Sequence, residues 1–297
     1  MNTPLSRREL LRNAVVAAAG LALPISLDSD KERLAAWTGT LRRESPIFRA
    51  RPFGRQAIRV GELAVGTPYE AFALEAYIKA GGSPSSNEHL ALSLTRFDCV
   101  TLVESCLAVA RVANTPGSPS WERFGQEIER MRYRGGKREG YASRLHYFSE
   151  WIFDGEKRGL VRDIGAELGG VNDVRPLRFM TEHRSSYPAL ADDGVFSAIG
   201  KMERGLDDHP RYVVAAERIP EVVDRIETGD VLAFATATPG IDVSHAAFAY
   251  RDAAGVLRVL HAPLSGGVVE VTRRTLPEYV SAIRRATGIL VARPLAG

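Results

Sequence analysis

The chain has 297 residues, of which 45% are hydrophobic and 25% charged, and its formal net charge is +3. This composition is that of a globular protein long enough to bury a sizeable core. The first 22 residues hold three arginines and one glutamate, a net +2, so the remainder carries only about +1. No stripe rich in arginine or lysine appears, which argues against nucleic acid as the main partner.

Residues 1–27 have the pattern of an export signal. Arg7 and Arg8 lie in a basic stretch, and an alanine-rich apolar run with small residues and Pro24 follows. The paired arginines and the mild apolar run are typical of a twin-arginine signal. A run of about ten to twelve residues is too short for a stable membrane span. We therefore predict an exported, periplasmic or cell-envelope protein; an amphipathic N-terminal helix is the alternative.

The rest of the chain, 28–297, is predicted to be a single domain with 28–60 as a peripheral segment. An amphipathic helix is expected over Glu32–Leu41, and an irregular basic segment after it. Thr67-Pro68 indicates a helix start with proline at the first position, and Leu90, Leu92 and Leu94 alternate like a short strand. After these, the pattern predicts helices over 99–114, 121–131 and 141–158, a strand over 171–179, and a helix over 180–200 that is interrupted at Pro188.

The C-terminal third changes character, because short β-type runs alternate with Gly, Asp and Pro turns. Strands are expected at 212–214, 231–234, 244–250, 256–261 and 267–271, with a closing helix over Leu276–Arg285 and a last strand over Gly288–Arg293. Helices followed by consecutive strands predict an α+β fold with a mainly antiparallel sheet. No internal repeat is visible.

The segment Thr95–Glu104 is interpreted as a turn that leads into a buried helix with a cysteine at its opening. Asp98 is a suitable N-cap, because its carboxylate can accept from backbone N–H groups two or three residues later. Cys99 then falls at the first helical position, where free amides and the helix dipole favour a thiolate. The apolar residues that follow cover more than one face of the helix, which predicts a central helix that holds the nucleophile firmly.

A structural role is the alternative for each cysteine, because free cysteine usually behaves as a small buried hydrophobe. Cys106, in the middle of the same apolar helix, fits that role. The helical rise places Cys99 and Cys106 about 10.5 Å apart, beyond the roughly 7 Å that a disulfide can bridge. Two free thiols and no disulfide are therefore expected.

Two histidines on neighbouring strands could complete a catalytic site with Cys99. If Arg251 pairs with Gly255 across a three-residue loop, His245 lies directly opposite His261 on the same face of the sheet. A one-residue slip would place them on opposite faces. In the predicted register, one imidazole serves as base for the Cys99 thiol and the second holds the first ring in its working tautomer. Backbone N–H groups at the helix start would stabilise the oxyanion.

Six motifs, in order along the chain, resemble the N-acetylmuramoyl-L-alanine amidase-like family of the NlpC-type, papain-related cysteine peptidases. They are Arg96–Glu104, Met131–Gly136, Ser143–Tyr147, Gly229–Val231, Gly240–His245 and Leu260–Ala262. The resemblance covers about residues 60–297 and implies a papain-like α+β core with extra helices that hydrolyses amide bonds in peptidoglycan. It places the family's catalytic residues on Cys99, His245 and His261. Ala246-Ala247 departs from the valine–glycine pair that often follows the family's catalytic histidine.

Other residues are weaker candidates for supporting roles. Asp242, three residues before His245, could shape the loop over the site or simply form a turn. Arg144 and Tyr147 would share one face of a helix and could contact an acidic, sugar-bearing peptide, whereas His146 would point elsewhere. Arg132 and Tyr133 could do the same or could lie in a solvated loop.

Three functions are weighed against one another. A cysteine amidase could cleave the lactyl–L-alanine amide or, alternatively, the γ-D-glutamyl bond inside the stem peptide. A zinc hydrolase is less well supported, because no H-x-x-E-H or H-E-x-x-H spacing occurs; chelation, and not thiol alkylation, would then abolish activity. A non-catalytic wall-binding module predicts that Cys99→Ala behaves like the parent. No metal or cofactor is expected.

Overall fold

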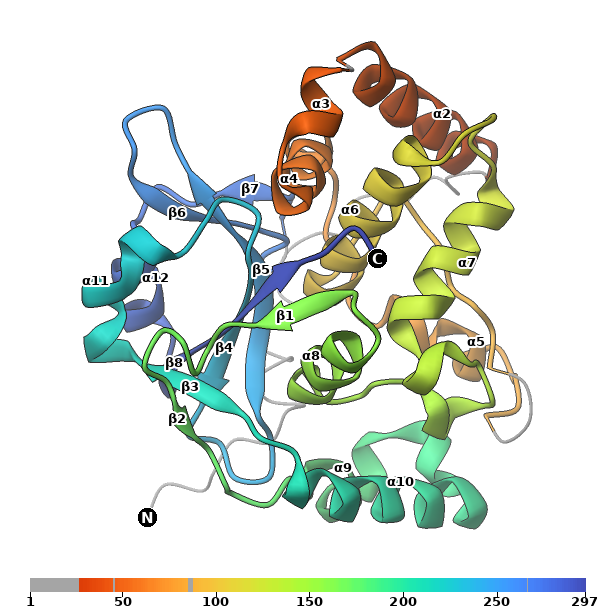
Figure 1. Ribbon diagram of the computed structural model, residues 1–297. Coiled ribbons are helices and arrows are strands. Elements are labelled where there is room, and N and C mark those ends of the chain that lie inside the picture. Colours follow the sequence, from red (N-terminus) through yellow and green to blue (C-terminus); the bar gives the residue numbers. More distant parts are fainter. Residues whose placement is uncertain (1–26, 45, 85–87, 266) are drawn as a thin grey trace.

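The computed structural model describes residues 27–44, 46–84, 88–265 and 267–297. Residues 1–26 of the expected export signal therefore lie outside the described residues. Helices lie beside a long twisted sheet (Figure 1). The helices are α2 (Leu27–Arg43), α3 (Ile47–Ala50), α4 (Phe53–Ala64), α5 (Ala76–Lys79), α6 (Cys99–Asn114), α7 (Trp121–Arg132), α8 (Phe148–Lys157), α9 (Phe179–Glu182), α10 (Asp193–Gly205), α11 (Ile219–Val222) and α12 (Leu276–Ala282). The strands are β1 (Val161–Asp163), β2 (Val171–Asn172), β3 (Tyr212–Ala215), β4 (Val231–Thr236), β5 (Val243–Arg251), β6 (Leu257–His261), β7 (Glu270–Val271) and β8 (Ala286–Pro294).

The sheet has the order β2-β3-β8-β4-β5-β6-β7, with β1 paired to β8, and its recorded strand pairs are antiparallel. Along β4 the side chains alternate between two cores, as the two-residue period of a strand requires. Val231, Ala233 and Ala235 face the core with α4, α6 and α7. Leu232 and Phe234 face the core with α11 and α12. The predicted α+β class with a mainly antiparallel sheet is confirmed.

Helix α6 is the centre of the larger core, and it is buried from Thr101 to Ala113. Side chains of α2 and α4 belong to the same core, among them Leu41 and Val60. The turn before β4 approaches α4 so closely that a Cβ on Gly229 would lie 2.0 Å from the Gly54 carbonyl oxygen. Gly229 also has a φ of +94°, which only glycine adopts at little cost. Helices α2 and α4 therefore pack against α6, and α4 also packs against the sheet.

Three expectations for the first hundred residues are wrong. The segment after residue 42 is not irregular, because α3 and α4 occupy it. No helix starts at Pro68, which instead forms a β-bridge with Val268. The alternating leucines form no strand: the Leu94 amide donates to the Asp30 carboxylate of α2 at 2.7 Å, so a side chain takes the place of a ladder partner.

The middle of the chain is helical in shorter pieces than predicted. The helix expected over 141–158 begins only at Phe148, because Arg144 is extended and bridges to Tyr133. The strand expected over 171–179 ends at Asn172, and α9 starts at Phe179. From Tyr212 onward, each expected strand and the closing helix are present, with boundaries that differ by a few residues. Within the described residues, no helix is long and apolar enough to cross a membrane.

Candidate active site

Cys99 is the first residue of α6, and the cap before it forms as predicted. The Asp98 carboxylate accepts from the Thr101 amide at 2.7 Å, and the Thr101 hydroxyl accepts from the Asp98 amide at 2.8 Å. This reciprocal capping box fixes the direction in which the chain enters the helix. Neither cysteine forms a disulfide with the other; Cys106 is buried and Cys99 is partly exposed. Burial raises the pKa of the Cys106 thiol, which disfavours its thiolate. Cys99, by contrast, is partly exposed and lies at the N-terminus of α6.

The two histidines meet, although the register differs from the predicted one by two residues. Arg251 pairs with Leu257 and Phe248 with Leu260. Continued along β5 and β6, this pairing places His261 opposite Ala247 rather than His245. A shift of two residues keeps the same face, and His245 Nε2 lies 2.9 Å from His261 Nδ1. The prediction that the rings share a face is confirmed, and the prediction that they lie directly opposite is wrong.

The loop between the two strands explains the shift. It consists of Ala253–Gly255, closed by the bond from the Asp252 amide to the Val256 carbonyl at 3.0 Å. The Asp252 carboxylate accepts from the amides of Ala254 and Val256, and Gly255 takes a φ of +81°. A glycine in the left-handed region at the third loop position is typical of three-residue hairpins, and this signal would have given the correct register.

Both imidazoles are buried, each with about 3% of its surface exposed. Burial holds the pKa of His245 well below its ordinary value, and the neighbouring His261 lowers it further. Burial also lowers the pKa of His261, to about 4. The pair is therefore neutral at neutral pH, with His245 able to accept a proton. Its ring stacks on Phe234 at a centroid distance of 5.7 Å, which fixes its plane.

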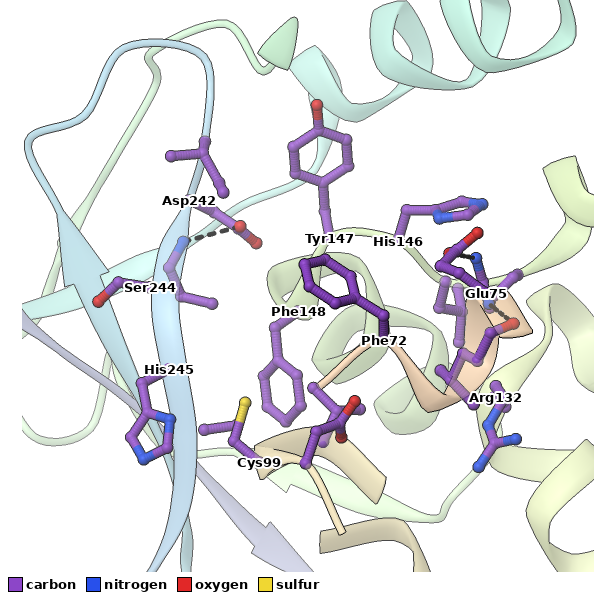
Figure 2. A pocket seen from close by; sticks show the side chains of 18 of the residues that line it. Phe72, Glu75, Cys99, Arg132, His146, Tyr147, Phe148, Asp242, Ser244 and His245 are labelled. Atoms are coloured by element: carbon purple, nitrogen blue, oxygen red, sulfur yellow. Dashed lines mark hydrogen bonds and ion pairs between the residues drawn. The ribbon is translucent and has the colours of Figure 1, made fainter. Parts of the chain in front are cut away.

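A cleft of about 240 Å³ contains Cys99 and His245 in its lining. Figure 2 shows the Cys99 sulfur and the His245 ring facing this cleft, with Phe148 beside them. His245 Nε2 is engaged by His261, whereas its buried Nδ1 has no hydrogen-bond partner among the described residues. No hydrogen bond therefore joins this nitrogen to the sulfur here, and catalytic contacts are often long before substrate binds. Nδ1 is the nitrogen left to serve as base.

Arg144 and Tyr147, two of the predicted supporting residues, line the same cleft, but their polar groups are already engaged. Arg144 is extended rather than helical, and its guanidinium pairs with Glu75 and, at 3.1 Å, with Glu88. Burial opposes the charge on Arg144, but the two carboxylates raise its pKa. The Tyr147 hydroxyl donates to Glu203 at 2.5 Å. These side chains therefore shape the wall of the cleft, and a direct contact with substrate would compete with strong internal bonds.

Asp242 also lies in the wall of the cleft (Figure 2). Its carboxylate accepts from the Ser149 amide at 2.7 Å and from the Val243 amide at 2.7 Å. Burial raises its pKa, and the bonds from the amides oppose that rise. Asp242 thus ties the start of β5 to α8, more than it forms a turn.

Several residues at the site are not predicted by any pattern in the sequence. Tyr279 of α12 has its hydroxyl 3.2 Å from His261 Nδ1, and the Glu270 carboxylate of β7 lies 3.7 Å from His261 Nε2. Phe72, 43% exposed at the edge of the cleft, has a φ of +61°. His146, which the helix expectation directed elsewhere, lines the cleft with Arg144. These positions depend on long-range packing, which local periodicity does not encode.

Comparison with known proteins shows the family of the chain. The sequence model of a family described as N-acetylmuramoyl-L-alanine amidase-like matches residues 59–289. Among curated proteins there is no match. The chain is similar to a crystal structure of an N-acetylmuramoyl-L-alanine amidase from Bacteroides uniformis, with 28% identity and a TM-score of 0.73 over 82% of this chain and 99% of that one.

Two further structures resemble it. One is a protein of Bacteroides fragilis named as a candidate xylanase, with 32% identity and a TM-score of 0.70 over 79% of this chain and 99% of that one. The other, from Legionella pneumophila, has 18% identity and a TM-score of 0.61 over 87% of this chain and 94% of that one, and it supports the fold alone. Since the family match spans most of the chain, the protein belongs to the N-acetylmuramoyl-L-alanine amidase-like family.

Proposed function

We propose that the protein is a cysteine-dependent hydrolase that cleaves an amide bond in peptidoglycan, with the bond between the muramoyl lactyl group and L-alanine as the preferred one. The observation that carries this proposal is the arrangement of His245. Its Nε2 is held by His261, and its Nδ1 is left without a partner at the cleft that also contains Cys99. This is the order of nucleophile, base and orienting group that covalent amide hydrolysis needs.

In the proposed reaction, the Cys99 sulfur bonds to the amide carbonyl carbon while the thiol proton passes to His245 Nδ1. Backbone N–H groups in the first turn of α6 stabilise the oxyanion. His245 then gives the proton to the departing amine as the C–N bond breaks, which leaves a thioester on Cys99. Water attacks the thioester, His245 takes the proton of that water, and the thiol is restored as the acid leaves.

The alternative bond is the γ-D-glutamyl bond inside the stem peptide. A second hollow of about 920 Å³ shares Phe72, Leu74 and Arg132 with the cleft, so a substrate can extend on both sides of Phe72. An extended binding surface suits either a glycan chain or a peptide, and product analysis separates the two bonds.

We also propose an NlpC-type, papain-related core, because a cysteine at a helix start, a histidine on β5 and a second histidine on β6 follow in that order. Export by the twin-arginine route is proposed from residues 1–27 and agrees with a cell-wall substrate. Glycoside hydrolysis has less support, since it uses a pair of carboxyl groups at the scissile bond. In this cleft, Asp98 caps α6, Glu104 pairs with Arg132 at 2.7 Å, and Asp242 accepts from backbone amides.

The test is digestion of purified peptidoglycan by the protein and by Cys99→Ala, with mass spectrometry of the products. Free intact stem peptides and glycan strands without peptide identify an amidase, whereas truncated stem peptides identify an endopeptidase. Cys99→Ala should lose at least about 10³-fold in rate, because the covalent route disappears. Cys106→Ala, in the same helix but buried, is the matched control and should retain activity.

Several outcomes would contradict the proposal. Equal digestion by the protein and by Cys99→Ala, or loss of activity on chelation without any effect of thiol alkylation, would remove the thiol mechanism. Release of sugars from xylan, with peptidoglycan left intact, would move the protein to a carbohydrate substrate. Equal binding of the wall by both proteins, without products from either, would make the protein a binding module.

A further inference from the structure

We propose that Glu270, assisted by Tyr279, acts as a positioning residue that fixes the proton on His261 and thereby leaves His245 Nδ1 free to accept the thiol proton. This inference rests on the proposed function, because it assigns a fourth member to the same proton path. Glu270 lies on β7 opposite His261 in the strand ladder, and Tyr279 lies on α12 against the His261 ring at a centroid distance of 5.2 Å.

The contacts at His261 Nδ1 limit where its proton can be. This nitrogen lies 2.9 Å from His245 Nε2 and 3.2 Å from the Tyr279 hydroxyl. A neutral imidazole has one N–H and one acceptor nitrogen. If Nδ1 of His261 is the acceptor, both His245 Nε2–H and the Tyr279 hydroxyl can donate to it. If Nδ1 carries the proton, His245 must accept at Nε2, and its own proton then moves to Nδ1, where it blocks the reaction with the thiol.

Glu270 distinguishes the two arrangements. Its carboxylate lies 3.7 Å from His261 Nε2, and this nitrogen is buried without a hydrogen-bond partner among the described residues. A lone pair at Nε2 would face a negative carboxylate without a proton between them, whereas an N–H there faces an acceptor. The carboxylate therefore favours the Nε2–H tautomer of His261. The side chain of Glu270 is 54% exposed, so it is not locked by packing at this distance from the nitrogen.

The resulting path runs in one direction through four side chains. In the proposed path, His261 Nε2–H is directed toward the Glu270 carboxylate, His261 Nδ1 accepts from His245 Nε2, and His245 Nδ1 faces the cleft that contains Cys99. The surroundings of Tyr279 fit this path: burial, then the nearby Cys99 and Glu270, raise the pKa of its hydroxyl. The phenol therefore stays protonated and remains a donor. Three titratable side chains face the histidine pair from neighbouring elements: Cys99 of α6 lines the same cleft as His245, and Glu270 of β7 and Tyr279 of α12 lie against His261.

The first experiment reads the tautomers directly, in the full chain without substrate. Nitrogen-15 spectra of histidine-labelled protein at neutral pH should show both His245 and His261 protonated on Nε2. Glu270→Leu should convert a large part of His261 to the Nδ1–H form, whereas Glu270→Gln, which keeps a neutral acceptor, should preserve the tautomer. Unchanged tautomers in Glu270→Leu, or an Nδ1–H His261 in the parent protein, would overturn the proposal.

The second experiment follows the alkylation rate of Cys99 by iodoacetamide between pH 5 and pH 9. Glu270→Leu should lower the alkylation rate at neutral pH by about tenfold. This factor corresponds to a loss of about one pKa unit in the basicity of the histidine pair when the nearby negative charge is removed. Glu270→Gln should fall in between, and Tyr279→Phe should lower the rate less than Glu270→Leu. Glu32→Leu removes an exposed carboxylate on α2 and is the matched control. Equal rates in Glu270→Leu and Glu32→Leu would contradict the assignment.

Because neither experiment contains peptidoglycan, both can succeed even if the substrate is another amide. With peptidoglycan as substrate, Glu270→Leu should lower kcat about tenfold and leave KM within about twofold, since Glu270 acts on the proton and not on binding. A rise in KM without a change in kcat would make Glu270 a substrate contact and would contradict its role as a positioning residue.

Discussion

At the scale of single residues, burial of the two imidazoles sets the response to acid. The pKa of His261 is lowered from 6.5 to about 4, and that of His245 is lowered well below 6.5. Because the base must be neutral, kcat/KM should remain high at pH 6.5 and should decline only well below that pH. A pH–rate profile on soluble muropeptides checks this, and a decline centred at or above pH 6.5 would contradict it.

The same shifts affect folding stability with a defined sign. Unfolded histidine binds a proton near pH 6.5, whereas folded His261 does so only near pH 4. The contribution of this group to stability is therefore complete above pH 6.5 and is lost as pH falls toward 4. Denaturant unfolding at several pH values measures this loss of unfolding free energy. It is thereby separated from the decline of kcat/KM at low pH, which is measured on folded protein.

Single residues also mark how far the sequence can predict the site. Cys99 and its cap are local features, and the hairpin brings His245 and His261 together within a short stretch of chain, so patterns suffice for them. Tyr279 and Glu270 reach His261 through a helix and a two-residue strand. Their contact depends on how those elements dock, which neither periodicity nor spacing determines.

At the scale of elements, the cap of α6 is expected to connect stability with catalysis. Asp98→Ala removes the bond to the Thr101 amide and should cost about 1 kcal/mol of unfolding free energy. It should also lower kcat, because the first turn positions Cys99. Ser120→Ala removes the comparable cap of α7, where the hydroxyl accepts from the Arg123 amide, and should lower stability by a similar amount with kcat unchanged. Denaturant melts and steady-state kinetics of both variants test this.

A fall in kcat of equal size in Asp98→Ala and Ser120→Ala would show that activity follows stability in general rather than the geometry at Cys99.

The helices and strands are predicted best where the hydrophobic periodicity is strong. Helices α6 and α7 and the strands from β3 onward have clear patterns. The segment around Arg144 was misassigned because buried ion pairs to Glu75 and Glu88 hold it extended, and such tertiary contacts override helix propensity.

At the scale of the whole molecule, Asp30 connects α2 to the segment that leads into α6. Its carboxylate, on α2, accepts from the Leu94 amide and from the hydroxyls of Ser93 and Thr95. Asp30→Ala leaves the buried Leu94 amide unpaired and should cost about 2 kcal/mol. Asp30→Asn keeps an acceptor and should cost less, and Glu32→Ala, exposed on the same helix, should cost little.

Urea unfolding measures these differences, with an unchanged m-value expected because the folded state stays compact. Equal midpoints for Asp30→Ala and Glu32→Ala would contradict a structural role for the carboxylate.

The overall class of the fold follows from the order of helices and strands along the chain. The place of α2 against residues 93–95 does not, because no local pattern pairs a helix with a loop more than sixty residues away.

The bond from Leu94 to Asp30 has a consequence for the family as a whole. The matched region begins at residue 59, so the acceptor for this backbone group lies outside the part of the chain that defines the family. A relative with a shorter N-terminus needs a water molecule, a different side chain or a rerouted loop at the same point. Helix α2 of this protein thus supplies the hydrogen-bond acceptor for the segment that leads into α6, and its loss during evolution would require a compensating change at that segment.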